Sequence, residues 1–88
     1  MITITLENQD QADLFVTVTD LNQAETPEIL KKQRINEGEF RLLDIQEDGH
    51  GTGRIRWLAQ RTDHPQKTAQ QVVTPEAGDT VEITTFFG

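Results

Sequence analysis

The chain has 88 residues, no cysteine, 34% hydrophobic residues and a formal net charge of −7. This length predicts a single domain spanning residues 1–88 with a small hydrophobic core. The lack of cysteine excludes disulfide bonds, thiolate metal ligands and a thiol nucleophile, and the acidic balance argues against duplex nucleic acid as a partner, because binding to phosphates requires a basic surface.

Charge and hydropathy are distributed unevenly along the chain. Residues 1–30 contain six acidic residues and no Lys or Arg, whereas every Lys and Arg lies between Lys31 and Lys67. We expect strands from the two ends to pair with this basic middle. No apolar run approaches the roughly 18 residues that span a membrane, and no signal peptide is visible. We therefore expect no membrane insertion, and the sequence indicates no localisation.

Alternation of apolar and polar residues begins at the start of the chain. Residues 2–6 and residues 14–19 each alternate Ile, Leu or Val with Thr or Phe, which is typical of half-buried strands. A polar segment separates the two runs. The pattern predicts a β-hairpin.

Residues 27–35 allow two interpretations. Thr26 and Pro27 would suit the start of a short helix, which would make the fold α+β. Against a helix, Ile29 and Ile35 lie on one face only if the backbone is extended. We favour a strand, whose Lys and Arg residues would suit an exposed sheet edge.

The second half of the chain predicts four more strands, over residues 40–45, 54–60, 68–74 and 80–84, with Phe86 and Phe87 at the end. In the first of these, Phe40 and Leu42 have one parity and Leu43 and Ile45 the other. This change of phase predicts a bulge or a strand that is buried on both faces.

Seven short strands without a long amphipathic segment predict an all-β fold, a small antiparallel β-sandwich. It would be immunoglobulin-like in architecture only. The immunoglobulin disulfide needs cysteine and the tyrosine corner needs tyrosine, and the chain has neither residue.

The glycine-rich loop over residues 46–53 is the most distinctive segment. Asp44, Glu47 and Asp48 offer oxygen ligands for calcium, and Gly49 falls where the calcium loop of an EF-hand needs a sharp turn. The closing glutamate is missing, however, because Ile55 occupies its position. The glycine spacing also differs from known phosphate-binding loops. We therefore expect an ordinary connecting loop, no metal site and no cofactor.

Catalytic machinery is not indicated. The chain has no serine and no cysteine to serve as the nucleophile of a hydrolytic triad, and its two histidines, His50 and His64, both lie in polar loops. No catalytic residue is therefore predicted, and we do not expect an enzyme.

Contact residues can be predicted only from exposed aromatic and basic positions. We interpret the chain as a binding or scaffolding module that contacts another protein, or itself, through an edge strand or an outer sheet face. The predicted contact residues are the aromatic and basic side chains Phe15, Lys32, Arg34, Arg41, Phe86 and Phe87.

A carbohydrate-binding module is the alternative. Trp57 between Arg54 and Arg56 could stack on an oligosaccharide beside the loop 46–53. The parity of Trp57 with Ile55 and Ala59 favours a place in the core instead.

Overall fold

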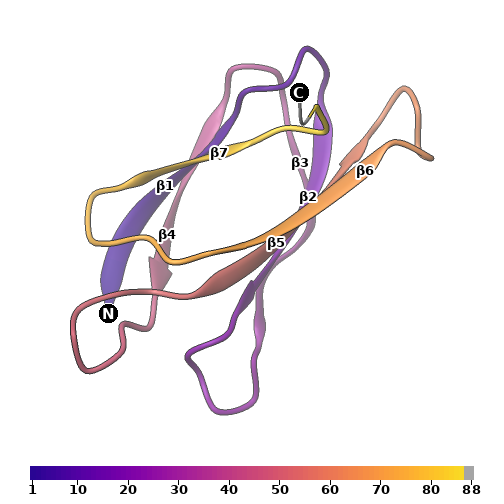
Figure 1. The fold of residues 1–88 in the computed structure, drawn as a ribbon. Coiled ribbons are helices and arrows are strands. Elements are labelled where there is room, and N and C mark those ends of the chain that lie inside the picture. The colour runs from indigo at the N-terminus through magenta and orange to yellow at the C-terminus, as the bar shows by residue number, and fades with distance from the viewer. Residues whose placement is uncertain (87–88) are drawn as a thin grey trace.

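The computed structural model describes residues 1–86 and contains seven strands and, within that range, no helix. The strands, labelled in Figure 1, are β1 (Ile2–Asn8), β2 (Leu14–Asp20), β3 (Glu28–Ile35), β4 (Phe40–Ile45), β5 (Ile55–Arg61), β6 (Thr68–Val73) and β7 (Thr80–Ile83). Residues 28–35 therefore form a strand, as favoured from the sequence, but irregularities in its pairing with β2 place Leu30, and not Ile29, on the buried side with Ile35.

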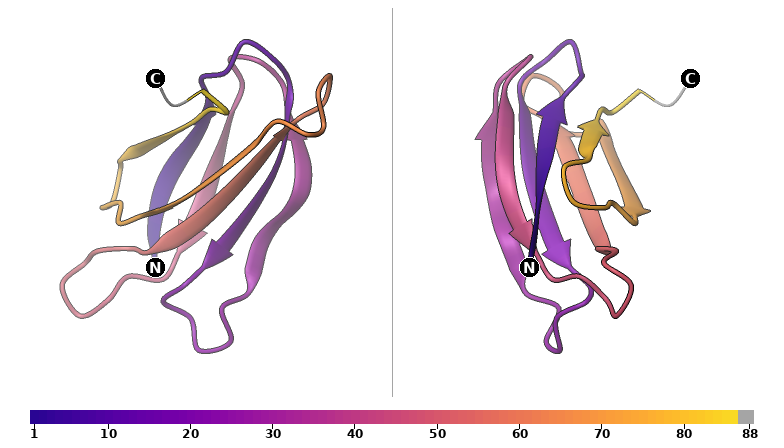
Figure 2. Two further views of the ribbon diagram at one scale, coloured as in Figure 1. Left: turned by 45° about the vertical axis from the view of Figure 1, so that its right-hand side comes forward. Right: turned by 90° about the vertical axis from the view of Figure 1, so that its left-hand side faces the viewer.

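The strands form two sheets that face each other, as Figure 2 shows. One sheet has the order β4-β1-β7 and the other has the order β3-β2-β5-β6. Every neighbouring pair is antiparallel except β1 and β7, which run parallel. The all-β sandwich predicted from the sequence is confirmed.

The core lies between the sheets and contains alternate residues of each strand. Trp57 is its largest side chain and is completely buried. On β5, Ile55 and Ala59 point inward beside Trp57, while Arg56 and Leu58 point to solvent. The alternation seen in the sequence therefore separates core from surface on this strand.

The hairpin predicted for the first two strands is wrong, because β1 and β2 lie in different sheets. Buried polar groups turn the chain from one layer to the other. The Asn8 side chain donates hydrogen bonds to the carbonyl oxygens of Ala12 and Ile35, each at 2.9 Å, and accepts one from the backbone N–H of Asp10 at 2.8 Å. Alternation reveals a strand but not its partner, so the sequence could not distinguish a hairpin from this crossover.

The phase change predicted in β4 is also wrong. The register between β1 and β4 is continuous, without a bulge. Leu43 and Ile45 are buried, whereas Phe40 and Leu42 are 60% and 65% exposed. The strand therefore alternates normally, and the apolar side chains of Phe40 and Leu42 are exposed to solvent on its outer face.

Strand pairing follows the charge distribution only in part, because the C-terminal strand β7 pairs with β1, where Glu82 is opposite Glu7, and not with the basic middle. The acidic N-terminal strands pair with the basic middle, β1 with β4 and β2 with both β3 and β5. Few side chains meet as ion pairs, however. One is the contact of Arg34 with Asp13 at 2.7 Å.

Candidate functional site: an open strand edge and a shallow pocket

Four strands lie at sheet edges, namely β3, β4, β6 and β7. An edge strand presents backbone N–H and C=O groups that no neighbouring strand satisfies, so another polypeptide can pair with it. Natural proteins block such edges with charges, bulges or short strands. The four edges of this sandwich differ in how well they are blocked.

The β3 edge is well blocked. Its register with β2 shifts at two places, which marks bulges. Lys32 lies at the first of these with a φ of 46°, and its N–H donates to the Thr17 hydroxyl at 3.1 Å. From β4, the Arg41 guanidinium donates to the Arg34 carbonyl oxygen at 3.1 Å. The irregular, basic edge of β3 is therefore unsuited to strand pairing.

The β4 and β7 edges are partly blocked. On β4, the Phe40 carbonyl oxygen accepts a hydrogen bond from the Arg41 guanidinium at 3.1 Å, and Asp44 adds a charge. Strand β7 has four residues and contains Glu82. Short length and charge both limit pairing along these edges.

The β6 edge is open. Among the seven strands described in residues 1–86, β6 alone has no charged side chain. Its register with β5 is regular along its whole length. It also contains no proline and no positive φ angle. By the criteria that distinguish blocked from accessible edges, β6 is the accessible one.

The hydrogen bonds at the ends of β6 show which backbone groups are free. The N–H of Arg61 donates to the Lys67 carbonyl oxygen at 3.1 Å, and the N–H of Gly53 donates to the Pro75 carbonyl oxygen at 2.7 Å. Odd-numbered residues from 67 to 75 therefore face β5. Because backbone groups alternate along a strand, the even-numbered residues Thr68, Gln70, Val72 and Thr74 direct theirs toward the open edge.

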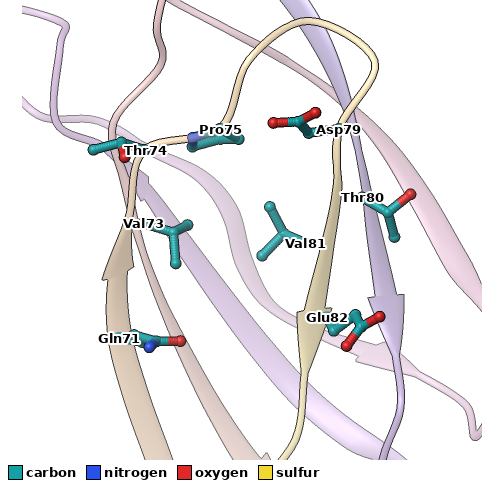
Figure 3. Close-up of a pocket in the computed structure, with 8 residues that line it drawn as sticks. All are labelled: Gln71, Val73, Thr74, Pro75, Asp79, Thr80, Val81 and Glu82. Carbon is teal, nitrogen blue, oxygen red and sulfur yellow. The ribbon is translucent and has the colours of Figure 1, made fainter.

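A shallow pocket of about 310 Å³ lies beside this edge, between β6 and β7. Figure 3 shows Val73 and Val81 directed into it from the two strands, with Asp79 beside them, while the Glu82 side chain points to the other side of β7. Val81 is buried and Val73 is half-buried. The pocket thus combines an apolar floor with an acidic group at its margin.

The segment after β7 is held by a buried carboxylate. The Oδ2 atom of Asp10 accepts hydrogen bonds from the N–H and the hydroxyl of Thr85, both at 2.6 Å. Burial alone would raise the pKa of Asp10, but hydrogen bonds from Thr85 and Gln11 outweigh it and hold that pKa below its usual value. Beyond Thr85, the Phe86 ring lies under the cationic groups of Arg61 and Lys67, at 5.5 and 5.3 Å.

The structure gathers only part of the predicted contact set. Phe15 is half-buried beside Lys32, whose ammonium lies 5.8 Å from the ring centre, and it is opposite Arg34 in the register. Arg41 lies on β4, in the other sheet, and Phe86 lies beside the β5–β6 turn. Phe87 is outside the described residues. Four of the predicted residues, namely Phe15, Lys32, Arg34 and Arg41, therefore lie together around the β3 edge, whereas Phe86 lies apart from them.

The stacking platform predicted for the carbohydrate alternative is not formed. Trp57 is completely buried, so it presents no ring face to a sugar. Arg54 and Arg56 are exposed, and no ion pair within residues 1–86 includes either of them.

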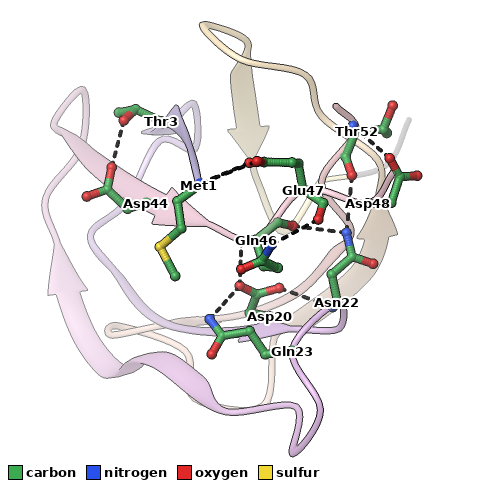
Figure 4. Close-up of polar contacts among 10 residues, drawn as sticks. All are labelled: Met1, Thr3, Asp20, Asn22, Gln23, Asp44, Gln46, Glu47, Asp48 and Thr52. Carbon is green, nitrogen blue, oxygen red and sulfur yellow. Dashed lines mark hydrogen bonds and ion pairs between the residues drawn. The ribbon is translucent and has the colours of Figure 1, made fainter. Parts of the chain in front are cut away.

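The carboxylates near the loop 46–53 have separate protein partners, as Figure 4 shows. Asp44 accepts a hydrogen bond from the Thr3 hydroxyl at 2.6 Å, and Glu47 pairs with the amino group of Met1 at 3.1 Å. Asp48 accepts the N–H groups of His50 and Thr52 in its own loop, and these bonds lower its pKa. Residues 1–86 contain no group of three or more side chains placed to hold a metal ion.

Buried Asp20 organises the base of that loop. Its carboxylate accepts hydrogen bonds from the backbone N–H of Gln46 at 2.9 Å, from the Gln23 side chain at 2.9 Å and from the backbone N–H of Asn22 at 3.1 Å. Asn22 in turn donates to the carbonyl oxygens of Gln46 and Thr52. This carboxylate therefore fixes loop structure.

Sequence reasoning missed two features of the surface, the open β6 edge and the exposed pair Phe40 and Leu42. The lack of charge in residues 68–73 was a visible signal for the first. No comparable signal marked Phe40 and Leu42. An apolar residue in a strand is expected to be buried, and the sequence does not show which face of this strand points to solvent.

Comparison of the chain with known protein families, with curated proteins and with solved structures finds no match. Residues 1–86 contain no helix long and apolar enough to cross a membrane. The assignment of a function therefore depends on the geometry of this chain alone.

Proposed function

We propose that this chain is a non-catalytic binding module that accepts an extended polypeptide segment along the free edge of β6. The observation that supports it is the contrast between edges. Strand β3 is bulged and charged, whereas β6 is regular and uncharged and has free backbone groups at Thr68, Gln70, Val72 and Thr74. Strand addition uses such groups for affinity.

The pocket beside β6 supports the same proposal. Side chains of an added strand alternate between the two faces of the sheet, so every second one would point toward the layer that contains β7. There Val73 and Val81 offer apolar contact, and Asp79 favours a basic side chain. The segment expected from this chemistry is extended, uncharged along its centre and basic at the end that lies beside Asp79.

The use of buried carboxylates supports a non-catalytic role. Asp10 and Asp20 are buried, and both accept several hydrogen bonds from the chain itself. The acidic residues that line the pocket, Asp79 and Glu82, are exposed. Acid–base catalysis generally requires a carboxyl group whose pKa is adjusted by its surroundings and which can still reach a substrate.

Binding of a short Val/Thr peptide with Lys at both ends, followed by fluorescence anisotropy, tests the proposal. Gln70→Pro removes the free N–H of Gln70, while Gln70→Ala retains it and serves as the matched control. We expect Gln70→Pro to weaken binding by about tenfold or more and Gln70→Ala to have little effect. Equal affinity of the two variants would contradict the proposal, and a peptide with Glu at both ends tests the acidic margin.

The exposed pair on β4 favours a second contact surface. Phe40 and Leu42 lie on the outer face of the three-stranded sheet, where the register places them beside Glu7 and Thr5 of β1. An apolar pair with the acidic Glu7 beside it suits a basic, partly apolar protein surface.

A further inference from the structure

We infer that the segment accepted by β6 is β6 of a second copy of this chain, in antiparallel, twofold-symmetric pairing. This inference rests on the proposed function and names the partner of the same site. Three observations support it. The first is the alternation of free backbone groups along β6, and the second is the charged residues beyond its two ends. The third is the protection of β3, the opposite edge of the same sheet.

The alternation of backbone groups limits the register. In an antiparallel pair, each residue that directs its N–H and C=O outward must be opposite another such residue. A twofold axis at Gln71 places Gln70 opposite Val72 of the second copy and Thr68 opposite Thr74. All four outward-facing residues then pair. An axis at Gln70 leaves Thr74 unpaired, and a shift of one residue places outward-facing groups opposite inward-facing ones.

Charge complementarity favours a second copy as the occupant. Each chain has a net charge of −7, so most faces of two copies repel each other. The β6 edge is uncharged, with Lys67 before its first residue and Glu76 shortly after its last. Antiparallel pairing about Gln71 brings Lys67 of one copy opposite Pro75 of the other, at the end of the pocket that Asp79 lines. The symmetry repeats this contact at the other end.

Self-pairing along β6 would also end at a dimer. The four-stranded sheets of the two copies would join into one continuous sheet, with β3 at each outer edge. Because β3 is bulged and charged, these outer edges do not accept another strand. The interface is closed by its symmetry, unlike a head-to-tail contact that continues into a fibre.

Disulfide cross-linking tests the register, because the chain contains no cysteine. A Gln71→Cys variant would place two Cys residues in a non-hydrogen-bonded pair with Cα atoms about 4.5 Å apart, which a disulfide can span. The two Cys residues of a Gln70→Cys dimer would lie farther apart, at about 7–8 Å. Gln33→Cys on the exposed part of β3 is the control for random collision.

Under mild oxidation we expect Gln71→Cys to form covalent dimers about tenfold faster than either other variant. Equal rates for all three variants would overturn the dimer, and the fastest rate for Gln70→Cys would overturn the register. Sedimentation adds a second readout, in which the native chain dimerises with rising concentration and Gln70→Pro stays monomeric. If the native chain stays monomeric but binds the Lys-ended peptide with the expected loss in Gln70→Pro, only the self-pairing fails and the proposed function survives.

Discussion

Asn8, Asp10 and Asp20 are buried polar residues at positions where the chain leaves a strand. Each satisfies backbone groups of a loop, and each would be costly to bury without those hydrogen bonds. The Asp10 carboxylate joins two segments that are 75 positions apart in the chain. Single polar side chains therefore hold the segments that connect the strands, and Asn8 does so where the chain crosses from one sheet to the other.

Asp10 gives the fold a dependence on pH. Its pKa in the folded chain is below its usual value, so its contribution to stability is complete above about pH 4 and is lost as the pH falls through the folded pKa. We expect Asp10→Asn to lower the free energy of unfolding by about 1–3 kcal/mol at neutral pH. Urea denaturation of both proteins from pH 7 to pH 2 measures this difference, which should shrink at the acidic end. A constant difference would contradict the assignment.

Trp57 is the single tryptophan and reports on the core. Because it is completely buried, its fluorescence should be blue-shifted, resistant to acrylamide and unchanged by added oligosaccharides. Trp57→Ala should destabilise the domain by about 3–5 kcal/mol, which approaches the whole stability expected of so small a domain. A red-shifted, readily quenched emission in the folded chain would be incompatible with this packing.

Two glycines provide a matched pair of substitutions. A Cβ atom on Gly53 would collide with the Ile45 side chain and approach the Pro75 carbonyl oxygen, whereas one on Gly49 would meet nothing within 4 Å. Neither glycine has a positive φ angle. We expect Gly53→Ala to cost about 1–3 kcal/mol and Gly49→Ala to be nearly neutral, as measured by thermal unfolding. Similar costs for both would show that the loop packs differently.

At the scale of the elements, alternation predicted that all seven strands exist and which side of β5 faces the core. It could not assign partners, because one polar linker between two strands permits either a hairpin or a crossover. The β1–β2 error has this origin, since the buried Asn8 and Asp10 look like ordinary turn residues in the sequence. In β4, apolar residues on both parities suggested burial on both faces, although Phe40 and Leu42 lie outside.

The candidate site was less predictable than the fold. Aromatic and basic residues were chosen because they often contact partners, yet Phe15 and Arg34 have partners within the chain, Lys32 and Asp13 respectively. The open edge is instead a property of backbone groups along β6, which no single residue type marks. The lack of charge in residues 68–73 was a signal for it, but placing β6 at an edge required the sheet order, which sequence alone does not provide.

The exposed pair on β4 gives a prediction at this scale. Because Phe40 and Leu42 are largely in solvent, their joint replacement by Thr should change the free energy of unfolding by less than about 1 kcal/mol. The same change should lower the binding of a hydrophobic dye. Chemical denaturation and dye fluorescence together check this, and a loss of several kcal/mol would mean that the two side chains are packed rather than exposed.

At the scale of the whole molecule, the four-stranded sheet has one edge that is blocked, β3, and one that is open, β6. The three-stranded sheet supports the open side with Val81 of β7 and with Asp79 just before that strand, while the β3 side is protected by bulges and by Arg41. This asymmetry limits how the domain can pair with an added strand, and it allows an interface that closes at two copies.

Residue-resolved amide hydrogen exchange along β6 tests this account most directly. The amides of Gln70 and Val72 should exchange rapidly in dilute solution and slow down as the concentration rises, whereas those of Gln71 and Val73 should be slow throughout, because β5 already binds them. Protection of Gln70 and Val72 equal to that of Gln71 in dilute solution would mean that the edge is already covered, and would contradict the account.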